Sequence, residues 1–151
     1  MIPPDASGLA AARQRIPYAA FLDVRMLRVD QGRHFHLPFR SSLVGNTVLP
    51  AIHGGVVAGF MENAALLHLL LQLNEARVPR SINFSIDFLR SAHAVDCFAS
   101  CAIARQGRRV AQVQVRCWQD EKGHPGRTRE IALARAHFLL GGHDGATETT
   151  A

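Results

Sequence analysis

Residues 54–75 form one long apolar stretch, and this stretch constrains the fold more than any other part of the chain. Read at helical spacing, residues 56–71 are apolar on nearly every side. A helix of that kind is buried on all sides rather than laid on a surface. At 1.5 Å per residue it spans roughly 30 Å, the width of a small domain. The sequence therefore predicts a single long core helix, and Pro79 excludes a continuation.

The predicted helix begins with two glycines, Gly54 and Gly55. The backbone N–H groups of its first turn are therefore not shielded by side chains, and the positive end of the helix dipole lies beside them. Together they can stabilise a developing negative oxygen. Two turns further on comes Glu62, among apolar neighbours. A carboxyl group in that setting points to chemistry, although a helical Glu is more often an ordinary solvated residue. Composition alone leaves both interpretations open.

After the helix the apolar residues alternate with polar ones, which is typical of strands. The clearest alternation begins at Ser81 and runs to Arg90, and three further strands are expected at 95–104, 110–119 and 129–140. Before the helix, a short amphipathic helix is expected at residues 5–16. A hairpin with strands at 21–29 and 33–40 should follow it, and a loop at 41–52 should lead into the core helix.

This order of elements predicts an α+β domain. A meander of strands needs its apolar face covered, and the core helix is the only element large and apolar enough to cover it. We therefore expect an antiparallel sheet of about six strands wrapped around one long helix, in a single domain over residues 1–140. The polar residues 141–151 are expected to form a flexible tail.

Composition excludes several classes of function. The net charge is +5 and Lys122 is the only lysine, but the arginines are scattered, so no nucleic-acid partner is expected. Residues 1–5 lack the features of a signal peptide. Polar residues interrupt the one long apolar run, so no membrane partner is expected and the cytoplasm is the predicted location. The three cysteines lack zinc spacing and are interpreted as small buried hydrophobes in a reducing compartment.

No metal site is expected. His34 and His36 lie two apart on one face of a predicted strand, which would allow a metal pair, but no third ligand is spaced nearby. Ordinary surface or cross-strand histidines are the simpler interpretation.

The start of the core helix resembles that of the hotdog-fold acyl-CoA thioesterases, in particular the PaaI-like and 4-hydroxybenzoyl-CoA thioesterase group. Their signature is His-Gly-Gly at the start of a long central helix, with Asp or Glu nine residues after the His. Here His53 precedes the two glycines and Glu62 is nine residues later. The sequence at 87–92 is similar to the family's Tyr-Leu-Arg-Pro-Ala strand end, and 106–109 resembles its Gly-Arg turn.

The resemblance implies catalytic roles for three residues. The N–H of Gly54 would polarise the thioester carbonyl, and Glu62 would act as nucleophile or general base. Family members also carry a polar amide in the loop six residues before the His. Asn46 is seven before and Thr47 is six before, and Asn46 is the residue we assign.

The resemblance also implies substrate contacts. His53 and Gly55 would shape the helix start. Ser81 matches a position where some relatives carry a catalytic serine, and a strand-capping hydroxyl is the alternative. Arginine suits phosphate by geometry, so the remaining candidates, for the coenzyme A phosphates, are Arg90, Arg108 and Arg109.

The implied function is hydrolysis of an acyl-CoA thioester, with no cofactor apart from the coenzyme A of the substrate itself. The alternative is a hotdog protein that binds acyl-CoA without turnover, as a sensor or accessory subunit. The resemblance further implies a homodimer, or a homotetramer built as a dimer of dimers, in which strand 81–90 meets its copy. Gly54 and Glu62 serving one substrate would then come from different chains.

Overall fold

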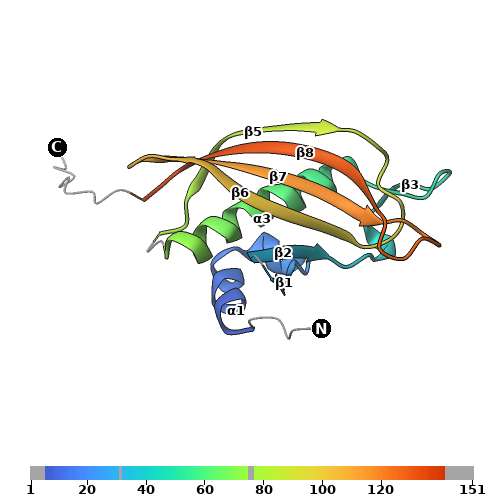
Figure 1. Ribbon diagram of the computed structural model, residues 1–151, viewed down its shortest axis with the longest axis horizontal. Helices are drawn as coiled ribbons and strands as arrows, with labels where there is room; N and C mark the ends of the chain where they lie inside the picture. Colours follow the sequence, from blue (N-terminus) through green and yellow to red (C-terminus); the bar gives the residue numbers. More distant parts are fainter. Residues whose placement is uncertain (1–5, 31, 75–76, 142–151) are drawn as a thin grey trace.

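In the computed structural model, a six-stranded antiparallel sheet wraps around the long helix α3 (Gly54–Leu73) (Figure 1). The structure describes residues 6–30, 32–74 and 77–141. Across the sheet the strands lie in the order β1 (Arg25–Val29), β2 (Gly32–Leu37), β6 (Cys97–Gln106), β7 (Val110–Asp120), β8 (Thr128–Leu139) and β5 (Arg80–Phe88). The predicted α+β hotdog architecture is therefore confirmed.

The core lies between α3 and the concave face of the sheet. Along β7 the side chains alternate as the period of two predicts, so that Val113 and Val115 are buried while Gln114 and Arg116 are exposed. Helix α3 contributes Phe60, Met61, Leu67 and Leu69, among others, to the same core. The helix is not buried on every side, however, because Glu62 and its neighbours Ala58 and Gly59 are only half-buried.

The amino-terminal region differs from the prediction. Helix α1 (Ala6–Arg15) agrees with the sequence, but Pro17 then starts a second helix, α2 (Pro17–Phe21), where a strand was expected from residue 21. Proline is favoured at the first position of a helix because its missing N–H is not needed there. A turn with Asp23 at positive φ separates α2 from β1. Both helices pack against α3.

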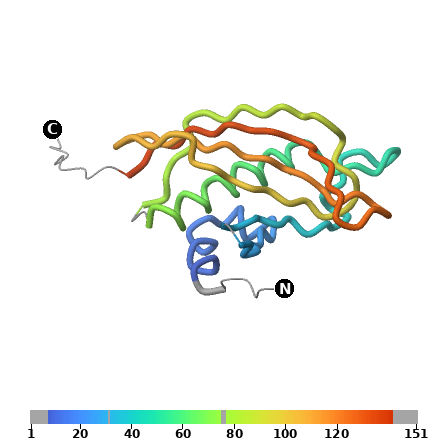
Figure 2. The backbone as a smooth tube through the Cα atoms, in the orientation of Figure 1, coloured from blue at the N-terminus to red at the C-terminus, as the bar shows by residue number. Residues whose placement is uncertain are grey.

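The segment between β2 and α3 is more ordered than a loop. It contains the 3-10 helix η1 (Ser41–Leu43) and a two-stranded sheet of β3 (Val44–Asn46) and β4 (Ala51–Ile52). The backbone trace places this hairpin, the start of α3 and the end of β5 at one end of the molecule (Figure 2). The turn between β6 and β7 lies at the other end, with the last turn of α3.

Within the described residues, α3 is the one helix long and apolar enough to cross a membrane. Polar residues within the apolar run therefore do not by themselves exclude a membrane span, contrary to the expectation from the sequence. Half of its most apolar window is buried inside the fold, as befits the core helix of a domain. The flexible tail predicted for residues 141–151 falls outside the described residues except for Gly141.

Candidate functional site at the start of the central helix

His53 caps helix α3 with its side chain. Its Nδ1 accepts a hydrogen bond from the N–H of Gly55 at 2.9 Å, and its carbonyl accepts from Val56 at 2.9 Å. Because Nδ1 is an acceptor, the neutral ring carries its proton on Nε2. The imidazole is therefore engaged in the cap, which agrees with the expectation that His53 shapes the helix start.

The capping residue His53 lies close to η1 and β3. The N–H of His53 donates to the carbonyl of Leu43 at 2.9 Å. A Cβ added to Gly45 would lie 2.7 Å from the Cβ of His53 and 2.8 Å from its Cα. Glycine is therefore required at position 45 for this close approach.

The N–H of Gly54 is the free donor of this helix start. Within the described chain it has no acceptor at hydrogen-bonding distance, whereas the neighbouring N–H of Gly55 is taken by His53. Gly54 is exposed and lines a cavity of about 400 Å³. A free N–H at the positive end of a 20-residue helix is a site for a negative oxygen.

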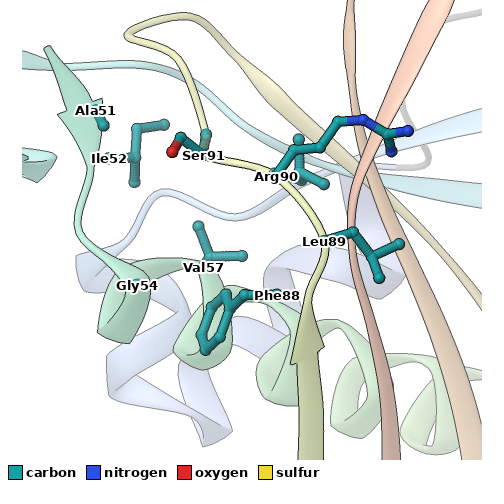
Figure 3. Close-up of a pocket in the computed structure, with 10 residues that line it drawn as sticks. Ala51, Ile52, Gly54, Val57, Phe88, Leu89, Arg90 and Ser91 are labelled. Carbon is teal, nitrogen blue, oxygen red and sulfur yellow. The ribbon is translucent and has the colours of Figure 1, made fainter. Parts of the chain in front are cut away.

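The cavity is formed by three segments that meet at Gly54 (Figure 3). Phe88, at the end of β5, lies against Gly54, because a Cβ added there would come within 3.4 Å of the Phe88 ring. The remaining lining residues are apolar or small, except for Arg90: Ala51, Ile52, Val57, Leu89, Ser91, Ala92 and Ile131. The Arg90 side chain extends away from Gly54 and donates to the carbonyl of Glu130 at 2.7 Å.

Gln119, which was not among the residues predicted from the sequence, fixes the segment that forms one wall of this cavity. Gln119 is fully buried near the end of β7. Its side chain donates to the carbonyls of His93 at 2.8 Å and Val95 at 3.1 Å, and accepts from the N–H of His93 at 2.9 Å. The same segment bonds to β4, since the carbonyl of Ala92 accepts from Ile52 at 2.8 Å. Gln119 thereby links the sheet to the strand that leads into α3.

Glu62 lies on α3 two turns beyond Gly54 and does not line the cavity at Gly54. Its side chain is half-buried. No partner for its carboxylate is found in the part of the chain that the structure describes. One turn before it, Gly59 lies under Tyr18 of α2, since a Cβ at Gly59 would come within 3.0 Å of that ring. Gly54 and Glu62 of one chain therefore do not meet in one cavity.

Asn46 lies in the β3–β4 hairpin, outside the cavity at Gly54. Its Oδ1 accepts from the N–H groups of Val48 at 3.0 Å and Leu49 at 3.2 Å, so the side-chain oxygen closes the turn. The adjacent Thr47 is exposed and also lies outside the cavity.

The remaining candidates are not brought together within one chain. Ser81 is exposed near the start of β5 and pairs with Phe138 of β8. Arg108 and Arg109 lie in the β6–β7 turn, at the end of the molecule opposite the helix start. Of the arginines expected to bind phosphate, only Arg90 lines the cavity at Gly54.

The two histidines considered as a metal pair have other partners. His36 bonds to Asp96 at 2.8 Å, and His34 meets the edge of the Trp118 ring. Burial opposes ionisation of Asp96, but the bonds from the N–H of Phe39 and from His36 hold the pKa of its carboxyl below the ordinary value. Among the described residues, no group of three or more His, Cys, Asp or Glu side chains could hold a metal ion.

Comparison with solved structures defines the class of fold. The chain is similar to the PaaI protein of E. coli from the phenylacetic acid degradation operon, with a TM-score of 0.71, 17% identity and coverage of 90% of this chain and 92% of that one. A thioesterase family protein from Silicibacter pomeroyi gives a TM-score of 0.72, 17% identity and coverage of 90% and 98%. A protein of Chromobacterium violaceum gives 0.68, 36% identity and coverage of 91% and 92%. The fold is that of the thioesterase superfamily, the hotdog fold.

A protein-family model gives the particular family. The model described as the acyl-CoA thioesterase N-terminal domain matches residues 45–139, more than half of the chain. The chain therefore belongs to this acyl-CoA thioesterase family. The matched region begins in the β3–β4 hairpin and contains the whole helix start and the sheet from β5 to β8. A search among curated proteins finds no match.

Proposed function

We propose that the protein is an acyl-CoA thioesterase, which hydrolyses the thioester to a free carboxylic acid and coenzyme A. The observation that carries this proposal is the free N–H of Gly54 at the start of α3, exposed in a cavity of about 400 Å³. Backbone donors of this kind stabilise the charge that develops on a carbonyl oxygen during acyl transfer. Family membership supports the substrate class.

The reaction requires one polarised carbonyl and one carboxylate. With Glu62 as general base, the carboxylate takes a proton from water, and the resulting hydroxide adds to the carbonyl carbon while Gly54 stabilises the oxyanion. The C–S bond then breaks, and the coenzyme A thiolate leaves and takes up a proton. With Glu62 as nucleophile, its oxygen attacks the carbonyl instead, and water hydrolyses the resulting anhydride.

The separation of these two residues favours a site shared between two chains. Eight residues of helix separate Gly54 from Glu62, a rise of roughly 12 Å. A donor to the oxyanion and a group acting at the same carbonyl carbon must both lie within hydrogen-bond reach of one small group. We therefore propose that Gly54 of one protomer and Glu62 of another serve one substrate.

Strand β5 supports an assembly of at least two copies, a homodimer or a homotetramer. It lies at the edge of the sheet, and among the strands that the structure describes it pairs only with β8. Its residues Ile82 and Phe88 are 56% and 55% exposed. A nine-residue edge strand with exposed apolar side chains pairs readily with another strand. Pairing of two β5 strands would also bring a second chain to the cavity beside Phe88.

The other candidates take supporting roles in this proposal. Asn46 keeps its side-chain amide available as a donor, because only its oxygen closes the hairpin turn. Arg90, Arg108 and Arg109 would meet the phosphates of coenzyme A, the last two from the far end of a neighbouring protomer. Ser81 would contact the substrate only if the partner's cavity extends along β5.

The first test replaces Glu62 by glutamine. Glu62→Gln should lower turnover of the best acyl-CoA substrate by about 100-fold or more, the effect of losing an acid–base group. Its melting temperature should hold or rise, because the amide is nearly isosteric and removes a half-buried charge. Thiol release from a panel of acyl-CoA esters measures turnover. Glu121→Gln, in the β7–β8 turn, is the matched control and should keep wild-type turnover.

The second test asks whether the site is shared. Gly54→Pro removes the N–H at the first helical position, where proline is tolerated, and should cost about 100-fold in turnover. Mixing this variant with Glu62→Gln should restore about a quarter of the wild-type rate, because half of randomly formed dimers then contain one intact site. Absence of recovery in mixtures that light scattering shows to be dimeric would contradict the shared site. Binding of acyl-CoA without any turnover would instead favour the sensor alternative.

A further inference from the structure

A second cavity, of about 390 Å³, lies beside the carboxy-terminal half of α3. Among the residues that line it are Arg33 of β2, His68 and Gln72 of α3, and Cys101 of β6. His68 is fourteen residues after Gly54, a separation of roughly 21 Å along the helix. This cavity is therefore distinct from the one at the helix start, and the proposed hydrolysis does not use it.

Two polar atoms of this cavity are buried without a partner. Nη1 of Arg33 and Nδ1 of His68 are both inaccessible to solvent and make no hydrogen bond within the described chain. The great majority of buried polar atoms in native proteins are paired. A guanidinium cannot relieve this by losing its proton. An unpaired buried donor of a charged group is costly to retain, so Nη1 of Arg33 lacks an acceptor. Nδ1 of His68 also lacks a partner, and it is a donor in one of the two neutral tautomers of the ring.

The electrostatics of the cavity indicate the charge of that acceptor. Among the described residues that line it there is no carboxylate, so none of them compensates the charge of Arg33. Burial, aided by the positive charge of Arg33, lowers the pKa of His68 to about 4.

We propose that this cavity binds a small oxyanion, a phosphate or a carboxylate, held by Arg33 and His68. Arginine presents a planar set of donors that matches both groups. His68, with its proton on Nδ1, donates a second hydrogen bond to the same anion. Gln72 adds a neutral polar group at the wall, while Val29 and Ile103 give room for a short apolar body.

The experiment titrates the wild-type protein with sodium phosphate and with sodium acetate, each against sodium chloride at equal ionic strength. The NMR signals of the His68 ring report occupancy directly. We expect saturable shifts of these signals with at least one of the two oxyanions and none with chloride. Saturation by phosphate alone, or by acetate alone, identifies the source of the oxyanion. Signals that follow ionic strength equally in all three titrations would overturn the proposal.

Variants at Arg33 separate a built site from general attraction by a basic protein. Arg33→Gln should weaken anion binding by about tenfold or more, because it removes the charged donor. Arg33→Lys should weaken it less, since it keeps the charge but loses the planar fork. Arg105→Gln, an exposed arginine on β6, is the matched control and should bind like wild type. Equal loss of binding in Arg33→Gln and Arg105→Gln would also contradict the proposal.

The thioesterase assay keeps this inference separate from the proposed function. Arg33 takes no part in the hydrolysis proposed above, so Arg33→Gln should turn over acyl-CoA at the wild-type rate. Anion binding can therefore fail while hydrolysis is observed, and hydrolysis can fail while anion binding is observed. Each result bears on one proposal alone.

Discussion

The polar groups around the two ends of helix α3 differ in how their hydrogen bonds are satisfied. At the amino-terminal end the backbone is tied to its surroundings by the bonds from His53 to Leu43 and from Ile52 to Ala92. Among the described residues at this end, the donor left free is that of Gly54, which is exposed, so water can satisfy it at little cost. In the carboxy-terminal half, Arg33 and His68 each bury an unpaired nitrogen.

The difference shows how a site that stabilises developing charge and a site that binds a ligand can each be recognised from hydrogen-bond donors without a partner. A free donor on a tightly bonded backbone is preorganised, which suits stabilisation of a charge that appears only during a reaction. A free donor buried in a cavity is destabilising until a ligand arrives, which suits binding. Substitutions can probe the rigidity of the amino-terminal end and the electrostatics of the other end.

The largest effect of a single substitution on stability is expected at Gln119. Gln119→Leu leaves two carbonyls and one N–H of the 93–95 segment without partners, so the free energy of unfolding should fall by about 3 kcal/mol. Turnover per folded molecule should fall by about tenfold, because the cavity wall beside Gly54 loses its support. Urea unfolding and thiol release measure the two effects. The control is Gln114→Leu, at an exposed position of the same strand, which should change the free energy of unfolding by less than about 0.5 kcal/mol. Wild-type turnover in Gln119→Leu would show that the cavity wall does not depend on the Gln119 side chain.

A smaller effect is expected at Gly45. The added Cβ in Gly45→Ala would lie 2.7 Å from the Cβ of His53, so the backbone before α3 must shift. We expect a loss of about 2 kcal/mol in stability, typical of overpacking, and a higher KM because the cap moves with His53. The control is Gly107→Ala, where the new Cβ would meet the carbonyl of Val110 at an ordinary 3.5 Å. Equal behaviour of the two variants would argue against a rigid helix start.

Much of the fold could be predicted from the sequence because the spacing of apolar residues in the core helix and in the strands after it follows the period of each kind of element. The core helix was placed at its correct start because two glycines precede a long apolar run, and the strands after it because their side chains alternate. Helix α2 was missed because Pro17 was interpreted only as the end of one helix, whereas it also starts the next. The β3–β4 hairpin was missed because strands of three and two residues show no period.

The site could be predicted only in part, because the residues that hold its walls in place are distant in sequence from the helix start. The His-Gly-Gly motif is local, and the cap made by His53 follows from it. Gln119 bonds to a segment about 25 residues away, and Arg33 and His68 line one cavity although they are far apart in the sequence. One signal was available for Gln119: it occupies an inward position in the alternation of β7, where a polar residue needs a buried partner. The roles of Glu62, Asn46 and the arginines depend on a second chain and stay predictions.

The last comparison concerns the pH dependence of stability at the carboxy-terminal end of α3. Burial, together with the charge of Arg33, holds the pKa of His68 at about 4 in the folded protein, against 6.5 for the free side chain. Below pH 6.5 the unfolded chain binds a proton that the folded chain does not. His68 therefore destabilises the fold progressively as the pH falls from 6.5 towards 4, and has no such effect above pH 6.5.

Replacing His68 by phenylalanine should accordingly flatten the slope of unfolding free energy against pH between 6.5 and 4, measured by urea unfolding without added oxyanion. Among the described residues that line the cavity, the other ionisable side chains are Arg33, Cys101 and His34, of which His34 lies against Trp118 on the opposite face of the sheet. Burial raises the pKa of the Cys101 thiol far above this range. Arg33→Gln should flatten the slope only in part, because burial remains when the charge is removed. Added phosphate or acetate, if bound, should flatten it in the wild-type protein as well, since an anion beside His68 favours the protonated ring. An unchanged slope in His68→Phe would mean that water reaches the ring freely, and the contrast between the two ends of the helix would then be lost.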